Sequence, residues 1–167
     1  MTWNGVSGAS SYQVFRSSDG GAYAQIASVT ASPYTDSSVA ASKTYLYKVN
    51  ATVNSVPTPY SNIDLATTIV FTNDNSLSGR SIAAVYLQEI RTAVNAVRAA
   101  ASLGALTFSN PATANSPVQA NDITTLRTGL AAAYNALGLT PAAFTDAVTS
   151  QFVIKGLHVQ EIRNATK

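Results

Sequence analysis

A repeat in the second half of the chain constrains the fold more than any other sequence feature. Residues 82–91 align with 118–127 and with 154–163, each copy 36 residues after the last, and every copy ends in arginine. An aromatic-led segment precedes each copy: Phe71-Thr72-Asn73, Phe108-Ser109-Asn110 and Phe144-Thr145-Asp146. The repeat units therefore start near 71, 108 and 144, and each combines an extended segment, a turn and one further element.

Apolar residues in the repeats are spaced as on one face of a helix. They recur at intervals of three and four residues, which places side chains along one side of an α-helix. These positions are Ala83, Leu87, Ile90, Val94, Val97 and Ala101 in the first copy and Ile123, Leu126, Leu130, Ala133 and Leu137 in the second. Gly104 and Gly138 follow as terminators. Because one helix cannot bury its own apolar face, we expect a three-helix domain over residues 69–167.

Residues 1–68 show the pattern of a β-sheet. Tyr45, Tyr47 and Val49 alternate with other side chains, which is typical of a half-buried strand. Residues 18–21, Ser-Asp-Gly-Gly, favour a hairpin turn, because glycine adopts positive φ without strain. The single tryptophan, Trp3, lies in this half of the chain.

The first half resembles a fibronectin type III domain of the bacterial kind. The resemblance rests on Thr2-Trp3-Asn4 and on residues 11–17, 34–36, 44–51 and 60–62. It implies that Trp3 lies in the core. It also implies that Tyr45 occupies the tyrosine-corner position, whose hydroxyl caps a neighbouring loop.

One departure from that family matters. The first strand and most of the second would precede Trp3, so this chain lacks them. An uncovered sheet edge is a template for strand addition. We expect either a neighbouring subunit or upstream residues of the same protein to fill the gap. The donor segments considered in a neighbour are 69–71, 110–117 and the C-terminal end.

The predicted fold class is therefore α+β with two domains. Residues 1–68 form a truncated immunoglobulin-like, fibronectin type III β-sandwich, and residues 69–167 form a small three-helix repeat domain. The repeats resemble an alanine-rich helical repeat of bacterial extracellular proteins, a resemblance that confers no known biochemical activity.

The recurrent arginines are predicted to be structural. Arg91, Arg127 and Arg163 occupy the same helical position in the three copies, and a guanidinium there could bind loop carbonyls or a carboxylate. Glu89 recurs as Glu161, but Thr125 replaces it in the middle copy. A paired-carboxylate active site is therefore not expected.

Three other candidate sites are weak. His158 aligns with Tyr86 and Asp122, which suggests a tolerant position and a structural or exposed histidine rather than a ligand. Asn73-Asp74-Asn75 is similar to a calcium loop, but the second copy offers Asn110 and Asn115 without acids and the third offers only Asp146, which favours a turn. Tyr60, Tyr23 and Tyr34 could form a sugar-stacking surface, although tyrosines on a sheet are more often packing residues.

The composition excludes several classes of protein. There are no cysteines, and no phosphate loop or nucleophile elbow occurs, so no catalytic residue, metal ligand or cofactor is predicted. The net charge is +2 and no basic run is present, which argues against nucleic-acid binding. No apolar run reaches the ~18 residues of a membrane helix, so membrane insertion is not expected.

These observations favour a non-enzymatic protein. We expect a structural or adhesive module of a bacterial extracellular or cell-surface protein, working through protein–protein contacts and self-association, as in a filament subunit. The low content of charged residues, 11%, suits stable exposure rather than a charged partner. The alternatives are an accessory region of a larger secreted polysaccharide-active enzyme and a carbohydrate-binding module that recognises surface glycans.

Overall fold

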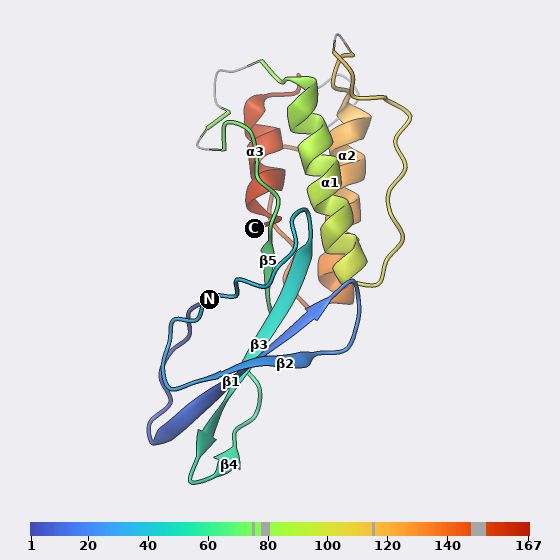
Figure 1. The fold of residues 1–167 in the computed structure, drawn as a ribbon. Coiled ribbons are helices and arrows are strands. Elements are labelled where there is room, and N and C mark those ends of the chain that lie inside the picture. Colours follow the sequence, from blue (N-terminus) through green and yellow to red (C-terminus); the bar gives the residue numbers. More distant parts are fainter. Residues whose placement is uncertain (75, 78–80, 115, 148–152) are drawn as a thin grey trace.

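The protein has a mixed α+β fold, in which a curled antiparallel sheet lies beside three helices (Figure 1). The structure is a computed structural model, and it describes all residues except 75, 78–80, 115 and 148–152. The described strands are β1 (Ala9–Ser18), β2 (Ala24–Val29), β3 (Thr44–Val53), β4 (Val56–Pro57) and β5 (Asp64–Thr67). The described helices are α1 (Ala84–Ala100), α2 (Ala120–Ala136) and α3 (Gly156–Asn164). The predicted α+β class is thus confirmed.

The strands form one sheet in the order β2-β1-β3-β4, with β5 also paired to β3. The hairpin between β1 and β2 turns at the predicted position, where Asp19 and Gly20 both have positive φ. In the central strands Val14 pairs with Val49, and the two side chains pack together with Tyr45 and Tyr47 on one face. This face is the core of the first half of the chain.

A second sheet, as a β-sandwich requires, is not assigned in the described part of the chain. Two short extended segments lie over the core face of the sheet instead. The Met1 nitrogen donates to the Tyr34 carbonyl at 2.9 Å, and the Tyr34 N–H donates to the Met1 carbonyl at 3.1 Å. Met1, Trp3 and Tyr34 pack against the face that contains Val14 and Tyr47. A partial second layer therefore covers the sheet without a continuous ladder.

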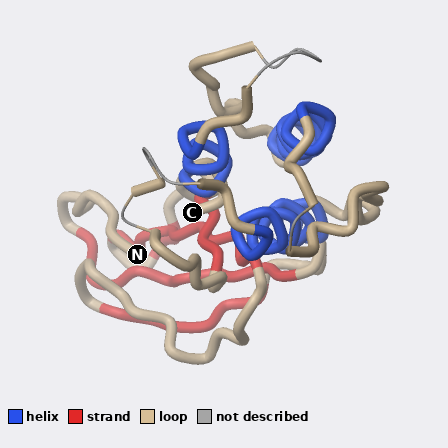
Figure 2. The backbone as a smooth tube through the Cα atoms, turned by 90° about the horizontal axis from the view of Figure 1, so that it is seen from above, coloured by secondary structure: helices blue, strands red, loops and turns tan. Residues whose placement is uncertain are grey.

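The three helices bury their apolar faces against one another, as the spacing predicts. Figure 2 shows them side by side around a common centre on one side of the sheet. Leu87, Ile90, Ile123, Leu126 and Ile162 are all at most 1% exposed. Each helix alone has one apolar face, so the shared core is what stabilises all three.

The recurrent arginines link the repeats into a closed ring. Arg91 of the first copy donates to the Asn110 carbonyl and the Asp122 carboxylate, both at 2.8 Å. Arg127 of the second copy donates to the Asp146 carbonyl at 2.6 Å and to Glu161 at 2.8 Å.

The third copy then returns to the first. Arg163 donates to the Thr72 carbonyl at 2.9 Å and to Glu89 at 2.7 Å. Each guanidinium also lies over the phenylalanine of the repeat that it contacts, with Arg91 over Phe108, Arg127 over Phe144 and Arg163 over Phe71, at 4.2, 4.3 and 5.0 Å from the ring centroids. Every repeat therefore binds the next one by the same three contacts, and the third binds the first.

A second recurring contact lies within each repeat. The third residue of the aromatic-led segment contacts the side chain of the third residue of the helix in the same repeat. Asn73 donates to the Tyr86 hydroxyl at 2.6 Å, and Asn110 donates to Asp122 at 2.7 Å. His158 Nε2 lies 3.1 Å from Asp146 Oδ2. Tyr86, Asp122 and His158 are all buried, so in each repeat this side chain anchors the loop to the helix, although the residue type differs from copy to copy.

The sheet and the helices share a buried contact. Leu46 of β3 and Leu65 of β5 pack with Ala100 at the end of α1. Partly buried side chains from both halves surround them, namely Tyr23, Ile63, Tyr134, Leu137 and Leu139. The helical core contains far more buried side chains than this shared cluster, which indicates that the helices depend little on the sheet.

We predict that the arginine ring is essential for the stability of the helical half. Arg127→Ala should lower the free energy of unfolding by about 1–3 kcal/mol, because it leaves a partly buried carboxylate and a carbonyl unpaired. Arg163→Ala should have the larger effect, since the Arg163 side chain is fully buried whereas that of Arg127 is 11% exposed. Urea unfolding measures both. Lys43→Ala, which removes an exposed ion pair, is the control, and an Arg127→Ala protein as stable as this control contradicts the prediction.

We also predict that residues 69–167 fold alone and that residues 1–68 do not. The helical faces bury one another, whereas the face of the sheet has only a partial second layer. Circular dichroism during heating of the two fragments tests this. A cooperative melting transition from the fragment 1–68 would show that the sheet is self-sufficient.

Candidate strand-binding groove

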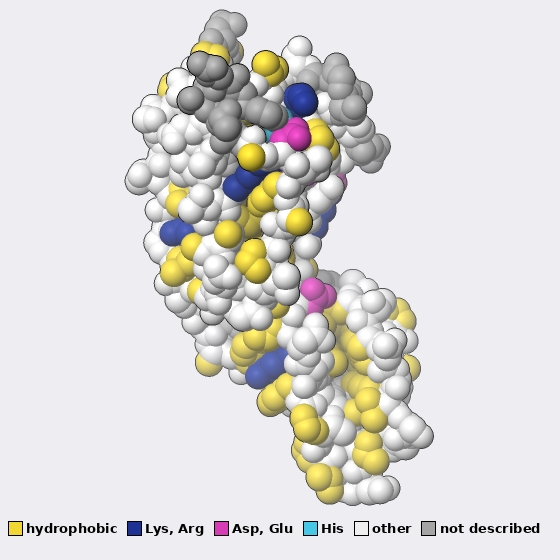
Figure 3. Space-filling model, turned by 180° about the vertical axis from the view of Figure 1, so that it is seen from behind, with side chains coloured by type: hydrophobic (Ala, Val, Ile, Leu, Met, Phe, Trp, Pro, Cys, Tyr) yellow, Lys and Arg dark blue, Asp and Glu magenta, His cyan; other side chains and the backbone are white. Residues whose placement is uncertain are grey.

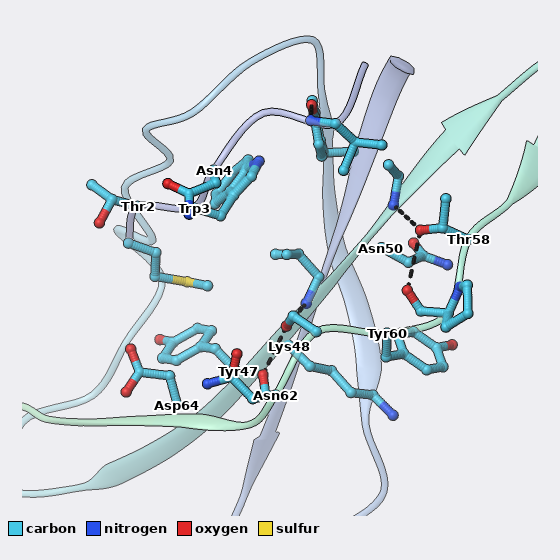
Figure 4. A pocket seen from close by; sticks show the side chains of 17 residues that line it. Thr2, Trp3, Asn4, Tyr47, Lys48, Asn50, Thr58, Tyr60, Asn62 and Asp64 are labelled. Carbon is cyan, nitrogen blue, oxygen red and sulfur yellow. Dashed lines mark hydrogen bonds between the residues drawn. The ribbon is translucent and has the colours of Figure 1, made fainter. Parts of the chain in front are cut away.

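A groove lies between the extended segment 1–4 and the segment 58–64, and its volume is about 550 Å³ (Figure 4). Tyr12, Tyr47, Val49 and Ala51 of the sheet also line it. In Figure 4, the side chains of Trp3, Tyr47 and Asp64 surround one part of the hollow, and Lys48, Tyr60 and Thr58 surround the other. The groove thus lies beside segment 1–4 of the partial second layer, over residues 47–51 of β3.

The first wall is an extended segment that is hydrogen-bonded on one side. Met1 binds Tyr34, and the Trp3 N–H donates to the Ser32 hydroxyl at 3.1 Å. Successive residues of an extended chain direct their backbone groups to opposite sides. The backbone N–H and C=O of Thr2 therefore point away from Ser32 and Tyr34, and no partner for them occurs in the described part of the chain.

The second wall replaces a regular strand by side-chain hydrogen bonds. Between β4 and β5, the Thr58 hydroxyl accepts the Ala51 N–H and the Ser61 hydroxyl accepts the Val49 N–H, both at 3.0 Å. The N–H groups of Thr58 and Ser61 donate in return to the carbonyls of Ala51 and Val49. The backbone groups of Val49 and Ala51 at this edge of β3 are thereby hydrogen-bonded, so segment 58–61 stays attached to β3 although it is not a regular strand.

Two buried polar atoms at the groove have no hydrogen bond. They are the Trp3 indole N–H and the Asn50 side-chain oxygen. A buried donor or acceptor without a partner typically costs about 1–3 kcal/mol. The Trp3 ring packs on Tyr12, with the ring centroids 5.5 Å apart, and the Tyr12 hydroxyl accepts the Val6 N–H at 2.7 Å.

A charged network under the groove holds its floor. The Tyr47 hydroxyl donates to Asp36 at 3.0 Å, and Arg16 donates to the same carboxylate at 2.7 Å. Burial alone would raise the pKa of Asp36, but hydrogen bonds from the side chain and backbone of Ser38, then from Arg16 and Tyr47, lower this pKa to about 2. Burial, followed by the contact with Asp36, raises the pKa of the Tyr47 hydroxyl.

The residues singled out in the sequence fall in different places. Trp3 lines the groove, half-buried against the sheet. Tyr45 lies on the same face as Tyr47, and its hydroxyl accepts the Ala40 N–H at 2.8 Å, a loop contact of the kind that the tyrosine corner makes. Arg91, Arg127 and Arg163 lie in the helical half and do not line the groove.

The weaker candidates are engaged in contacts within the fold. His158 Nδ1 accepts the Lys155 N–H at 3.1 Å. The Asp74 carboxylate binds Lys167, with both oxygens 2.6 Å from the ammonium. Asn75 lies outside the described residues. Among the described residues no group of three or more His, Cys, Asp or Glu side chains could hold a metal ion.

The three tyrosines considered for sugar stacking do not form one surface. Tyr23 and Tyr60 lie on either side of Lys48, whose ammonium is 4.3 Å and 3.8 Å from the two ring centroids. Tyr34 packs instead against the core face of the sheet. Figure 3 shows hydrophobic side chains gathered along the part of the molecule formed by the sheet, with few charged groups among them.

Sequence reasoning missed several groove residues. Ser61 belongs to the run 60–62 that carries the fibronectin type III resemblance, but no motif marks Thr58 or Asp64, and none of the three was predicted to line a site. Lys48 alternates with Tyr47 and Val49 in the predicted half-buried strand, but no role was predicted for it.

Comparisons with known proteins give no match. No protein family model matches the chain, and neither a curated protein nor a solved structure matches it significantly. Among the described residues, no helix is long and apolar enough to span a membrane.

We predict that Asp36 makes stability depend on pH in the acid range. Its pKa is about 2 in the folded protein against 3.8 ordinarily, and its side chain is 5% exposed. Folding therefore gains roughly 2 kcal/mol above pH ~4, and this gain is lost as the pH falls toward 2. Asp36→Asn should be less stable at pH 7 and should lose less stability between pH 4 and 2. Urea unfolding at each pH measures this, with the exposed Asp19→Asn as control; equal pH slopes for Asp36→Asn and the parent protein would contradict the prediction.

Proposed function

We propose that this chain is a non-catalytic structural or adhesive module of a bacterial extracellular or cell-surface protein. In this proposal it works through protein–protein contacts, and the groove between residues 1–4 and 58–64 binds an extended segment of polypeptide. The bound segment completes the second layer of a fibronectin type III-like sandwich.

The observation that carries the proposal is the unsatisfied first wall of the groove. Thr2 lines a space of about 550 Å³, its backbone groups have no partner among the described residues, and the buried Trp3 indole N–H nearby has none either. An added strand would pair with such a backbone by main-chain hydrogen bonds, and its alternate side chains would enter the hollow beside Tyr47 and Val49.

The arrangement of the sheet supports the likeness to fibronectin type III domains. β1, β2, β3 and β5 are antiparallel, and β1, β2 and β3 carry the aromatic core on one face. Trp3 and Tyr34 pack on top of this face, where the second sheet of a sandwich would lie.

The donor segments considered in the sequence are all engaged within their own chain. Phe71 is buried under Arg163, and Asn110 and Ala112 are buried between the first two repeats. At the C-terminal end Thr166 is buried and Lys167 binds Asp74. A neighbouring copy would have to release these contacts before donating any of the three segments, so a filament built in this way requires partial unfolding of each donor.

The carbohydrate-binding alternative receives less support. Lys48 covers one face of both Tyr23 and Tyr60, and the edge of Phe15 meets Tyr60 at a centroid distance of 5.1 Å. Stacking of a sugar needs an open ring face, and the Tyr60 ring, although the residue is 51% exposed, is in contact with both Lys48 and Phe15.

We predict that peptides selected from a random displayed library will bind in the groove. The enriched sequences should alternate apolar and polar residues, because alternate side chains of a bound strand face the hollow. Binding should shift the emission of Trp3, the single tryptophan, to shorter wavelength. Thr2→Pro, which removes an N–H facing the groove, should weaken binding at least about tenfold, an effect comparable to losing a buried hydrogen bond.

Val70→Ser is the matched control, because Val70 is the most exposed large hydrophobic residue described, at 90%, and lies outside the groove. Failure to enrich any peptide, or equal binding to the parent protein and Thr2→Pro, would reject the proposed function. Sedimentation velocity of the chain alone distinguishes the source of the segment, since association that also shifts Trp3 emission indicates a second copy.

A further inference from the structure

The third repeat, residues 144–167, is held in the arginine ring at two junctions. One junction joins it to the second repeat and the other joins it to the first. The hydrogen bonds of the described residues at both junctions end on residues 146–167 of this repeat, and none involves the connection from α2 that precedes it. The partners in the first two repeats are Thr72, Asp74, Glu89, Arg127 and Tyr134.

Residues 140–143 of that connection have few contacts. In the described part of the chain they make no hydrogen bond, none of them is buried, and none packs in an apolar cluster. The hydrogen bond before them joins the Leu139 N–H to the Tyr134 carbonyl at 2.9 Å. The one after them joins the Thr145 N–H to Glu161 at 2.9 Å, within the third repeat. Segments with so few contacts open at a low cost in free energy.

The corresponding connection between α1 and α2 is tied to its helix. Asn95 and Arg98 of α1 bind backbone groups of residues 104–106, both at 2.8 Å. The repeat spacing places Ala131 and Tyr134 of α2 at the equivalent positions. Alanine has no side-chain acceptor, and the tyrosine hydroxyl donates instead to a carbonyl at the end of the third repeat. The second connection therefore lacks the two contacts that hold the first one.

α3 buries less apolar surface than the other two helices. It has nine residues, whereas α1 and α2 have 17 each. Its buried apolar side chains are Val159 and Ile162, whereas α2 buries Ile123, Leu126 and Leu130 among others. Since the cost of exposing a helix grows with its buried apolar area, the third repeat is the one whose release costs least.

We propose that two copies of this chain exchange their third repeats, so that residues 144–167 of each copy close the ring of the other. Each junction contact that is broken in one ring forms again in the partner's ring, so the two forms differ chiefly in the path of residues 140–143. Reciprocal exchange fills both rings, whereas an open row of copies leaves one ring unfilled. The product is therefore a dimer.

This exchange goes beyond the proposed function and does not depend on the groove. The exchanged segment binds in the helical half, whereas Trp3 packs on the sheet. A dimer formed by exchange should thus leave the emission of Trp3 unchanged, which separates it from association through the groove.

Charge reversal at the junction between the second and third repeats tests the proposal. Full-length Arg127→Glu and Glu161→Arg proteins each place two like charges at this junction in their own ring. When one copy of each exchanges its third repeat with the other, one ring contains the native pair and the other contains the reversed pair. The two proteins are mixed in urea, refolded together and examined by native mass spectrometry.

We expect the mixed dimer to exceed either single-variant dimer at least about tenfold, because like charges meet in both rings of the latter. The variant with both changes in one chain checks that the reversed pair permits folding. The matched control mixes Lys43→Glu with Asp19→Lys, whose exposed pair lies in the sheet half, and should give only the statistical proportion of mixed dimer. Monomers alone, or a statistical proportion from the junction variants, overturn the proposal if the double variant folds.

A shortened connection tests the exchange with both junctions native. Phe144 lies under Arg127, and Leu139 is bonded to Tyr134, which is seven residues, or about 10 Å, further along α2. Deletion of residues 140–143 leaves the Cα atoms of Leu139 and Phe144 only about 3.8 Å apart. The third repeat then cannot close its own ring with all its contacts, although it can close that of an adjacent copy.

We expect sedimentation velocity to show a dimer of the shortened protein, with the helical circular dichroism of the parent. A shortened protein that stays monomeric, whether its ring is closed or open, overturns the proposal. This result decides the question even if the charge-reversed double variant does not fold.

Discussion

The arrangement of the helical half depends on one interaction, the fork of an arginine that holds a backbone carbonyl and a carboxylate of the next repeat. It occurs at Arg91, Arg127 and Arg163 with donor–acceptor distances of 2.6–2.9 Å. A planar guanidinium has two parallel donors, so it fixes the position of the loop and of the helix at once. Because the third repeat binds the first, the ring closes, and the number of repeats in it is set at three.

Buried ion pairs stabilise a fold only when their hydrogen-bonding groups are well matched, since desolvation opposes the attraction. In this protein the terminal nitrogens of the ring arginines are well matched to their oxygen partners. The buried Nε–H of all three arginines, however, lacks a partner. In the middle repeat the carboxylate that accepts the arginine comes from a different position of the helix. Thr125 stands where the other repeats have glutamate, and Asp122, one turn earlier, receives Arg91 as well as the side chain of Asn110 and the N–H of Gln119.

The sheet is organised in a different way. Its core face is aromatic and only partly covered, and it meets the helices through a small cluster around Leu46, Leu65 and Ala100. Of the buried polar side-chain atoms without partners in the described sheet half, those of Trp3 and Asn50 line the groove, whereas those of Gln13, Tyr23 and Thr44 lie elsewhere. The helical half therefore buries its apolar faces within itself, whereas the core face of the sheet half is only partly covered.

The sequence by itself determined the periodic features: the helical apolar faces, the β1–β2 hairpin and the arginine at one position in every repeat. These follow from spacing within one element, where backbone geometry alone sets which side chains share a face. Spacing could not show that Asp122 partners Arg91, that Tyr86 and His158 are buried anchors, or that Trp3 and Asp64 line one groove. Those facts depend on contacts between segments as distant as Thr72 and Arg163, and only the path of the folded chain brings such segments together.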